Sequence, residues 1–533
     1  MMTQTLTTMR EVRGAAAWRN EFARLMAAGM PERPSALSIG QRPRVLIPML
    51  VGASELFAVR EGFIAHALRQ RGADVALVLC DGYEACDART FDHDSVSMCQ
   101  SCVHHGDEQL QGLGLPVLKT SEWLDAPTSA ALKRLAQQTP LDRILDVHHA
   151  GIALGRFVFG STLRYFRAGR LNLEDPQMAS MMRRNLATAL LMTEGARRMF
   201  ETLRPDTVFS SHGVYATWGP WSALARAMNI PSVIYGGGWR ANTLICQKNM
   251  ERRLHCDDIW PAWSDVPLSA DEERQLDEYL ATREDNRADF TQYFEQINQD
   301  QAAFMQRHDL ASTRWRRILG AFANVAFDAA EPETQGAFED MFEWLESLVA
   351  WAAEHHDVLL LVKAHPAESR FVEQTPQDWR IATMLAKRYE SLPANVRLIA
   401  PDDPISPFVL YRLIDIGLVN TSTVGLEMAL QGKTVMTTGA QVHYGKPGIV
   451  LSPSSRIEYF DTLARLADGT ELFHPDRDLV RRYAYTMYFR KSLPFEPIEV
   501  QTWEPVGTRI ERLHDLGPGM FAGLDELCDM ILL

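Results

Sequence analysis

The chain has 533 residues, of which 23% are charged and 46% belong to the broad hydrophobic class. This balance is typical of a folded globular protein and excludes a largely disordered chain, and at about 150 residues per domain the length predicts more than one domain. The net charge of −14 excludes broad, sequence-independent binding to nucleic acid, because such binding needs a basic face that neutralises phosphates. A local basic pocket for one phosphate group is compatible with this charge.

No stretch of the sequence approaches the roughly 18 uncharged apolar residues of a membrane-spanning helix. The N-terminus does not resemble a signal peptide, because charged residues interrupt any apolar core there (Arg10, Glu11, Arg13, Arg19 and Glu21). We therefore expect a cytoplasmic protein without a transmembrane segment. Its seven cysteines do not suggest a disulfide scaffold, and the cytoplasm would keep them reduced.

The first elements in chain order predict a sheet of parallel strands. Residues 1–40 are expected to form an N-terminal arm, with a helix near Met9–Ala28. Continuous apolar runs at Arg44–Val51 and Asp74–Cys80 predict two buried strands, and the segment between them, Glu55–Gln70, has a helical pattern. A strand–helix–strand unit with two buried strands is typical of a parallel α/β sheet.

The same order returns further along the chain. Strands are predicted at Asp206–Ser211 and Ser232–Tyr235, with a helix at Gly219–Met228 between them. The segment from about Ser269 to Gln301 is strongly charged and predicts an exposed helical connector. A second series of alternating elements follows it: strand Ile318–Asp328, helix Glu333–Glu354, strand Asp357–Val362, strand Asn395–Ala400, helix Pro407–Ile414, strand Ile416–Val419, helix Val424–Gln431 and strand Thr434–Thr438.

These elements predict two doubly wound, Rossmann-like α/β domains. In such sheets ligands bind beyond the carboxyl ends of the strands, and the cleft between the two domains is the expected active site. The predicted organisation is an arm (1–40), an N-terminal Rossmann-like domain (41–265) with a Cys-rich insertion (80–106), a charged helical connector (266–310), a C-terminal Rossmann-like domain (311–480) and a tail (481–533). The tail, rich in Arg, Tyr and Phe, is expected to pack back on the domains or to rest on a membrane surface.

A hydroxyl-rich turn joins a predicted strand to a predicted helix at Asn420–Glu427. Thr421, Ser422 and Thr423 lie where the free N–H groups of a helix start carry a partial positive charge, which favours phosphate binding. Ser and Thr are also common helix caps, but three consecutive hydroxyl residues exceed what one cap needs. We therefore interpret this turn as a phosphate site.

The sequence Lys363-Ala364-His365-Pro366 ends another predicted strand of the same domain. The imidazole of His365 could donate to a phosphate oxygen or act as an acid near neutral pH. Pro366 stops the strand, which predicts an abrupt turn at His365. A solvated histidine on an ordinary turn is the alternative, and the hydroxyl-rich turn in the same domain favours the functional interpretation.

The stretches KAHPAE and NTSTVGLEMALQGKTVMTTG, followed by HYGKPG, resemble capsule polysaccharide biosynthesis glycosyltransferases of the Kdo-transferase-like and polysialyltransferase-like kind. The resemblance covers about Ile318–Val450. It implies the GT-B arrangement, in which two Rossmann-like domains face each other across a cleft. It also implies a nucleotide-activated sugar as donor, with a CMP-sugar favoured.

The same resemblance assigns roles to individual residues. In these relatives a His-Pro motif and a Ser/Thr motif bind the nucleotide, and His365 with Pro366 and Ser422 with Thr423 match them. Glu427 matches an acidic residue that commonly contacts the ribose. With Lys363 and Thr421 beside them, these residues form the predicted nucleotide site.

Candidates for the acceptor and the base lie in the N-terminal half. Glu55 follows the first strand and could deprotonate an acceptor hydroxyl, although an acid in the first turn of a helix is equally ordinary. His212 ends another strand and is a second candidate base or acceptor contact. Gly237 permits close approach of a ligand, and Arg240 could hold an anionic group, with a flexible loop and a surface arginine as the alternative.

Four of the seven cysteines, Cys80, Cys86, Cys99 and Cys102, lie within 23 positions of one another. Such a set suits a tetrahedral structural zinc, and the C-x2-C spacing of the last pair is that of a zinc knuckle. The histidines nearby would be spare ligands (His93, His104 and His105). The first spacing is looser than usual and a buried thiol at a strand end is ordinary, so zinc and plain thiols both stay open.

The sequence therefore predicts a glycosyltransferase that moves a sugar from a nucleotide-activated donor to a surface polysaccharide or glycolipid. A helix terminus and His365 would stabilise the leaving phosphate, so we expect the chemistry to need no metal cofactor. The alternatives are a CDP-polyol phosphotransferase, a nucleotide-sugar epimerase or hydrolase, and a non-catalytic scaffold of a polysaccharide assembly complex. We expect the protein at the inner face of the membrane if it associates with one.

Overall fold

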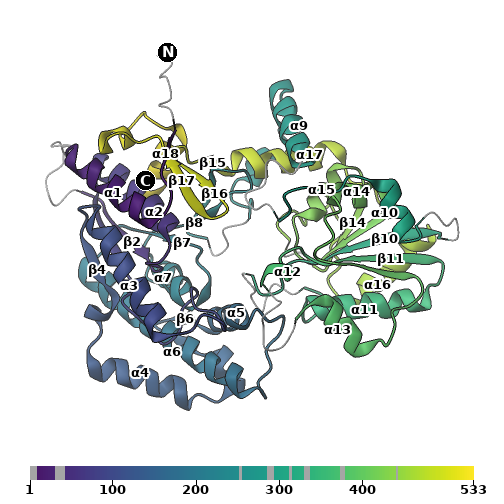
Figure 1. Ribbon diagram of the computed structural model, residues 1–533, viewed down its shortest axis with the longest axis horizontal. Helices are drawn as coiled ribbons and strands as arrows, with labels where there is room; N and C mark the ends of the chain where they lie inside the picture. The colour runs from purple at the N-terminus through teal and green to yellow at the C-terminus, as the bar shows by residue number, and fades with distance from the viewer. Residues whose placement is uncertain are drawn as a thin grey trace. The chain divides into compact units, whose positions relative to one another are not determined.

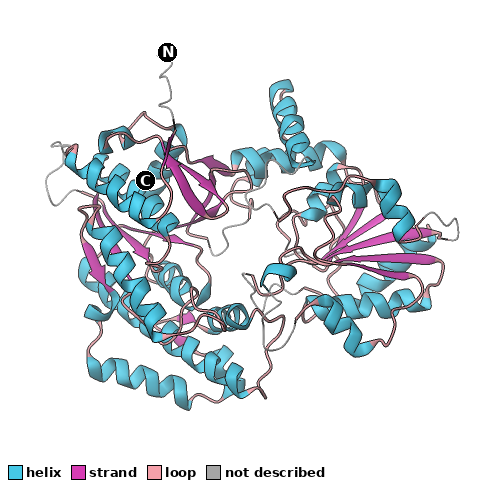
Figure 2. Cartoon of the chain, in the orientation of Figure 1, coloured by secondary structure: helices cyan, strands magenta, loops and turns pink. Residues whose placement is uncertain are grey.

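The computed structural model describes residues 9–30, 42–250, 255–284, 293–310, 315–328, 336–371, 379–439 and 442–533. The chain divides into two compact units. The first unit comprises Met1–Tyr165, Asn172–Leu254 and Tyr488–Leu533, and the second comprises Phe166–Leu171 and His255–Met487. Each unit contains a twisted, largely parallel sheet with helices packed on it (Figures 1 and 2), so the predicted α/β class with Rossmann-like domains is confirmed.

The sheet of the first unit has seven strands in the order β15-β9-β8-β7-β2-β3-β4. The five strands from β8 to β4 are parallel, whereas β9 pairs antiparallel with β8 and with β15. From β2 the chain winds one way to β3 and β4, and from β7 it winds the other way to β8. The strands are β2 (Arg44–Met49), β3 (Asp74–Leu79), β4 (Val117–Lys119), β7 (Thr207–Ser211), β8 (Ser232–Gly237), β9 (Thr243–Lys248) and β15 (Ser492–Pro494).

Helices cover both faces of this sheet. Right-handed crossovers in the two winding directions place α2 (Glu55–Gln70) and α7 (Tyr215–Ala227) on opposite faces. On one side α2 packs against α18 (Ala522–Leu532), and on the other α7 packs against the long α6 (Pro176–Leu203). The remaining larger helices of the unit are α1 (Ala15–Ala27), α3 (Val96–Gln111), α4 (Ala126–Gln138) and α5 (Gly155–Phe166).

The second unit has a five-stranded, fully parallel sheet in the order β12-β11-β10-β13-β14. The chain winds one way from β10 to β12 and then the other way from β13 to β14. The strands are β10 (Arg317–Phe322), β11 (Val358–Lys363), β12 (Val396–Ile399), β13 (Ile416–Val419) and β14 (Thr434–Thr437). The helices include α9 (Ala270–Glu284), α10 (Gln301–Arg307), α11 (Met341–Glu354), α13 (Ile381–Arg388), α14 (Pro407–Leu413), α15 (Val424–Leu430), α16 (Arg456–Asp468) and α17 (Arg477–Tyr485).

Residues 9–30 are part of the first unit rather than an arm. The short strand β1 (Arg10–Glu11) pairs with β17 (Glu504–Thr508), which in turn pairs with β16 (Ile498–Gln501). Trp18 is fully buried, and its indole N–H donates to the Pro505 carbonyl (2.9 Å). The apolar residues of α1 recur at helical spacing and supply core contacts, and β1 pairs with β17, so segments far apart in the sequence are joined in one small sheet.

The charged segment predicted as a connector belongs to the second unit. Its helix α9 contacts α17, where Arg481 pairs with Glu273 and with Asp277 (2.7 Å). Arg283 at the end of α9 pairs with the buried Glu427. Some of the charged side chains of this segment therefore form ion pairs within the second unit. The boundary between the two units in this part of the chain lies between Leu254 and His255.

The tail is divided between the two units. Residues up to Met487 stay with the second unit, and residues from Tyr488 onward complete the first. Several of its aromatic side chains are buried, with Tyr483 at 0% and Tyr488 at 1% exposure, whereas Trp503 is 53% exposed. The tail thus packs on the protein, which was the first of its two predicted placements.

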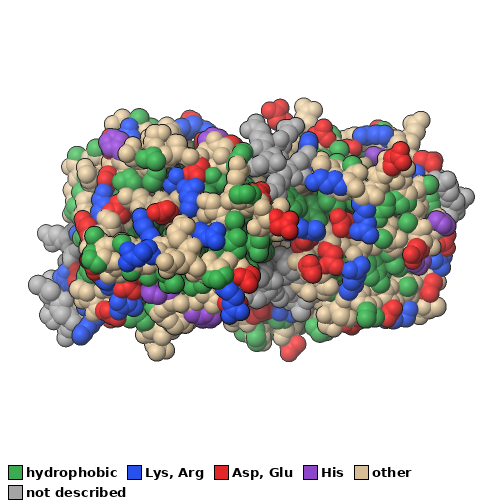
Figure 3. Space-filling view, turned by 90° about the horizontal axis from the view of Figure 1, so that it is seen from below, with side chains coloured by type: hydrophobic (Ala, Val, Ile, Leu, Met, Phe, Trp, Pro, Cys, Tyr) green, Lys and Arg blue, Asp and Glu red, His purple; other side chains and the backbone are tan. Residues whose placement is uncertain are grey.

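No helix among the described residues is long and apolar enough to span a bilayer. On the face of the molecule seen in Figure 3, Lys and Arg side chains are interspersed with Asp and Glu side chains. This face shows no broad basic stripe of the kind that binds nucleic acid backbones.

Asn395 fastens the amino ends of β11 and β12 to the end of α11. Its buried amide donates to the carbonyls of Ala352 (2.7 Å), His355 (3.1 Å) and Val358 (2.8 Å). We expect Asn395→Ala to lower the free energy of unfolding by about 2 kcal/mol, because it removes the three hydrogen bonds of a buried amide, although the Ala352 and His355 carbonyls keep the backbone donors His355 N–H and Val358 N–H. Urea unfolding measures this, with the exposed Asn172→Ala as control; equal effects of the two changes would contradict the assignment.

Candidate functional site

The candidate site of the second unit lies where its sheet reverses its winding direction. Asn324 follows β10 and Thr421 follows β13, and the Asn324 amide donates to the Thr421 hydroxyl (2.9 Å). These are the two strands between which the connections part, so a crevice opens beyond their carboxyl ends. The sequence predicted Thr421 there but not Asn324, because the predicted strand Ile318–Asp328 included Asn324, whereas β10 ends at Phe322.

Tyr444 of the HYGKPG stretch contacts the turn formed by Thr421, Ser422 and Thr423, which we call the hydroxyl turn. The Tyr444 hydroxyl donates to the carbonyl of Ser422, while the Ser422 hydroxyl accepts from the backbone N–H of Val424 (3.3 Å). Thr423 is the N-cap of α15 but makes no side-chain capping bond. Because α15 has only seven residues, its helix dipole is small. A phosphate at this turn would therefore be bound mainly by the side chains and backbone N–H groups of the turn.

His365 is a neutral hydrogen-bond donor in this structure. Burial, reinforced by the charge of Lys363, lowers the pKa of His365 to about 4. Its Nδ1 accepts from the backbone N–H of Ala367 (3.1 Å), so the ring proton lies on Nε2. The ring of Tyr293 packs edge-on against it at 5.3 Å between centroids. A neutral imidazole N–H can bind a phosphate oxygen without itself titrating near pH 7.

Two other predicted residues are engaged by the protein itself. The ammonium of Lys363 donates to the Ala400 carbonyl (2.8 Å), and burial lowers its pKa to about 8. Glu427 accepts from the Tyr411 hydroxyl (2.8 Å) and pairs with Arg283. Both residues therefore fasten elements around the site, and their contacts to a nucleotide stay predictions.

A small pocket adjoins these residues, lined among others by Asn324, Phe342, Ala367, Glu368 and Trp379. Two of its polar atoms, Asn324 Oδ1 and the Trp379 indole nitrogen, are buried without a hydrogen-bond partner among the described residues. The Trp379 ring lies 5.4 Å from that of Phe342. Buried polar atoms without partners are costly, and the pocket beside them has a volume of only about 10 Å³, close to what a single water molecule needs. No sequence pattern pointed to Trp379.

His212 occupies a strained turn at the matching position of the first unit. The N–H of Gly213 donates to the Ser211 carbonyl (2.7 Å), which closes a γ-turn centred on His212 with φ of +59°. Such a turn is rare for a residue with a side chain. The His212 ring packs against Trp218 and Phe57, at 4.9 and 5.6 Å between centroids. The turn lies at the carboxyl end of β7, beside β2, where this sheet also reverses direction.

The other predicted residues of the first unit lie in two places. Glu55, in the first turn of α2, has its Oε1 3.9 Å from His105 Nε2. Arg240 donates to the Tyr488 carbonyl (2.7 Å) and stacks over Phe489, so it holds the tail in this structure. Gly237 ends β8, and an added Cβ there would meet no atom within 4 Å. Its contact with substrate and that of Arg240 stay predictions.

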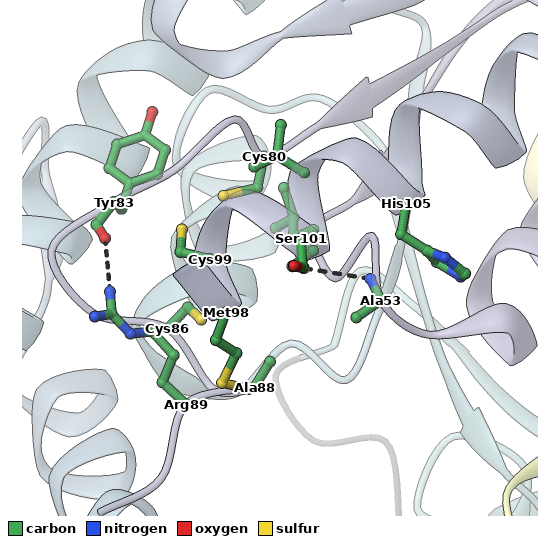
Figure 4. Close-up of a pocket in the computed structure, with 13 residues that line it drawn as sticks. Ala53, Cys80, Tyr83, Cys86, Ala88, Arg89, Met98, Cys99, Ser101 and His105 are labelled. Carbon is green, nitrogen blue, oxygen red and sulfur yellow. Dashed lines mark hydrogen bonds between the residues drawn. The ribbon is translucent and has the colours of Figure 1, made fainter. Parts of the chain in front are cut away.

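The four clustered cysteines line one pocket of about 260 Å³ between β2, β3 and α3. Figure 4 shows the sulfurs of Cys80, Cys86 and Cys99 turned into it, and Cys102 Sγ accepts from the Ala53 N–H (3.2 Å). Burial raises the pKa of Cys86 to about 12 and that of Cys80 further. His105 also lines the pocket, whereas His93 and His104 are exposed.

The described side chains do not include three or more His, Cys, Asp or Glu residues placed to hold one metal ion. Because neutral thiols are poor ligands, zinc binding at this pocket would need the thiols to draw together and lose protons. The structural zinc therefore stays a prediction.

Comparison with known proteins adds one family. Residues 328–490 match the family described as capsule polysaccharide biosynthesis protein, and this range includes Lys363–Pro366, the hydroxyl turn and the HYGKPG stretch. The sequence matches no curated protein.

Similar solved structures are distant ones. The beta Kdo 2,4 transferase of Thermosulfurimonas dismutans KpsC is 15% identical, with 58% of this chain and 87% of that chain covered and a TM-score of 0.35. The UDP-GlcNAc 2-epimerase of Neisseria meningitidis, bound to UDP-GlcNAc, is 11% identical over 84% of this chain and 97% of that chain, with a TM-score of 0.26. The glycosyltransferase SnogD of Streptomyces nogalater is 15% identical over 85% and 95%, with a TM-score of 0.24.

Gly425 leaves the space that the Tyr444 ring fills. An added Cβ would lie 2.3 Å from the Tyr444 hydroxyl and 2.9 Å from its ring. We expect Gly425→Ala to lower the free energy of unfolding by about 1–3 kcal/mol, and Tyr444→Phe in the same chain to restore part of it. Thermal unfolding measures this with Gly237→Ala as control. Simple additivity of the two changes would contradict the packing described.

Metal content tests the zinc prediction. The prediction requires one zinc per chain, lost in Cys99→Ser and in Cys102→Ser but kept in Cys246→Ser, whose thiol lies in β9 outside the pocket. Elemental analysis of the purified protein measures it. Zinc-free protein whose melting temperature does not respond to a chelator would contradict the prediction.

Proposed function

We propose that the protein is a glycosyltransferase of capsule or other surface polysaccharide synthesis, which takes its sugar from a nucleotide-activated donor. The observation that carries this is the family match over residues 328–490, because it covers His365 after β11 and the hydroxyl residues Thr421–Thr423 after β13, two strands that flank β10 in the second sheet. The same residue types in a binding crevice of this fold suit a nucleotide phosphate.

The donor phosphate would be bound by neutral groups. His365 offers its Nε2–H, and the hydroxyls of Thr421, Ser422 and Thr423 lie half-buried at the turn beyond β13. As the bond to the sugar breaks, negative charge grows on the phosphate, and donors already fixed around it stabilise that charge. Transfer of this kind requires no divalent cation, which is part of the proposal.

The nucleotide would extend from the phosphate site along the carboxyl ends of the strands. The pocket beside Trp379 has a volume of about 10 Å³, which is no more than a single water molecule needs, so the base is not assigned to it. The resemblance of the KAHPAE and NTST stretches favours CMP as the nucleotide. The first unit would supply the acceptor, a polysaccharide or glycolipid, at the cytoplasmic side of the membrane.

Nucleotide binding tests this proposal directly. We expect CMP to raise the melting temperature of the full chain, because a ligand that binds only the folded state stabilises it by mass action. His365→Gln should weaken binding by about 10- to 100-fold, since a hydrogen bond to a charged group contributes roughly 1.5–3 kcal/mol. Calorimetric titration with CMP, CDP, UDP and GDP measures both.

His355→Gln is the matched control, because His355 lies at the amino end of β11 and His365 at its carboxyl end. A response to UDP or GDP alone would keep nucleotide binding and overturn the CMP donor. No response to any of the four nucleotides would overturn the transferase in favour of a scaffold. Release of free sugar without an acceptor would indicate a hydrolase.

A further inference from the structure

Glu61 is a buried acid in α2 that the donor site does not use. Its side chain is 0% exposed, and its Oε1 accepts a hydrogen bond from the Tyr235 hydroxyl (2.7 Å). Its Oε2 is buried without a hydrogen-bond partner among the described residues. A buried carboxyl with an unsatisfied oxygen is costly to keep, so it calls for a reason other than packing.

Hydrogen bonds connect this acid to the strained turn at the end of β7. Tyr235 and Ser211 are partners in the register of β8 and β7, and their hydroxyls hydrogen-bond. The Ser211 hydroxyl also bonds Nδ1 of His212. A continuous chain therefore runs from Glu61 through Tyr235 and Ser211 to His212, from the interior of the unit to the crevice edge of its sheet.

Rigid elements hold each member of this chain. The Tyr235 ring stacks on Phe209 at 4.8 Å and 9° between planes. The His212 ring is fixed between aromatic rings of α2 and α7, and its φ of +59° stores strain in the turn. Strained backbone of this kind persists where the surroundings enforce it, and it clusters at sites that need a fixed side chain.

We propose that His212 is the acid–base residue that acts on the acceptor hydroxyl, and that Glu61, Tyr235 and Ser211 are positioning residues that fix its ring and set its basicity. The substrate in this proposal rests on the proposed function. The series of hydrogen bonds from Glu61 to His212 does not depend on the proposed function, and it can be tested without measuring enzyme activity.

The donor and acceptor of each hydrogen bond in this series follow from the bond at its buried end, between Tyr235 and Glu61. Tyr235 donates to Oε1 of Glu61, so its own oxygen accepts from Ser211, and Ser211 in turn accepts from the Nδ1–H of His212. This tautomer leaves the lone pair of His212 on Nε2. In the transfer step the acceptor oxygen bonds to the anomeric carbon of the donor sugar. The bond from that carbon to the phosphate oxygen breaks with its electron pair on the phosphate, and the acceptor proton passes to His212.

The protonation state of Glu61 would then change the basicity of the His212 imidazole. Burial raises the pKa of Glu61 to about 8, against the opposing effects of the Tyr235 hydrogen bond and the Arg60 charge. The other titratable or charged groups near this cluster are Cys246 of β9 and, next to that thiol, Lys491 and Glu526. As the pH rises through about 8, Glu61 loses its proton, and the new negative charge favours the protonated form of His212.

Histidine NMR on the full chain tests the coupling. With 13C-labelled histidine, and His212 assigned from His212→Gln, the His212 signal should show a second inflection near pH 8. Glu61→Gln and Tyr235→Phe should each abolish that inflection. Tyr459→Phe is the matched control, because it removes an equally buried hydroxyl, bonded to the Trp344 indole, in the other unit.

Turnover gives a second readout. Above pH 8, where Glu61 is ionised, Glu61→Gln should lower kcat by about 10-fold with KM unchanged, whereas at pH 7 it should leave kcat close to that of the unmodified protein. His212→Gln should lower kcat by about 100-fold or more at either pH. Glu61→Gln should not lower the melting temperature at pH 7. The folded pKa of Glu61 is raised, so folding favours the neutral carboxyl, which an amide resembles. A lost inflection together with a large fall in melting temperature would indicate a merely structural role and overturn the proposal.

The two proposals fail separately. If the titration of His212 is the same in all variants, the proposed coupling of Glu61 to His212 is wrong, even where the second unit binds CMP and the protein transfers sugar. An intact chain without nucleotide binding overturns the transferase and leaves the acid–base assignment of His212 without its proposed substrate.

Discussion

The reversal of winding in each parallel sheet is the constraint on which the rest of the structure depends. Right-handed connections that leave in opposite directions cannot cover the carboxyl ends of the two strands between them. In the second unit these strands are β10 and β13, and in the first they are β2 and β7. The exposed ends are where Asn324, Thr421 and His212 lie. The candidate site residues thus lie at the carboxyl ends of the strands that the helical connections do not cover.

Both candidate sites use neutral groups where charged ones might be expected. His365 is kept neutral by burial and by the neighbouring Lys363, and its proton is placed on Nε2 by one backbone N–H. In the first unit burial keeps Glu61 protonated to a higher pH than usual. Low dielectric around such groups makes their hydrogen bonds stronger and their loss more costly. A site built this way needs its partners fixed in advance, which the buried Tyr444 and Tyr235 do.

Much of this architecture could be predicted from apolar runs. The bounds of α2 and β13 agree with their predicted ranges, and the rule that ligands bind at strand ends placed His365, Ser422 and His212 at the right edges. The long α6 was not predicted, although its apolar residues recur at helical spacing. Asn324, Trp379 and the Glu61–Tyr235 pair were also missed. Their partners lie far away in sequence, and no local pattern encodes a hydrogen bond across 174 positions.

The sheet of β1, β17 and β16 has a consequence for the order of folding during synthesis. Strand β1 comes from the first residues of the chain, and its partner β17 from the last thirty or so. The second unit is encoded almost entirely between them. A ribosome therefore releases all the sequence of the second unit before the first unit can close its edge and dock α18. The amino-terminal half must wait in an unfinished state, with Trp18 and the β9 edge uncovered, until the segment from Tyr488 onward has been synthesised.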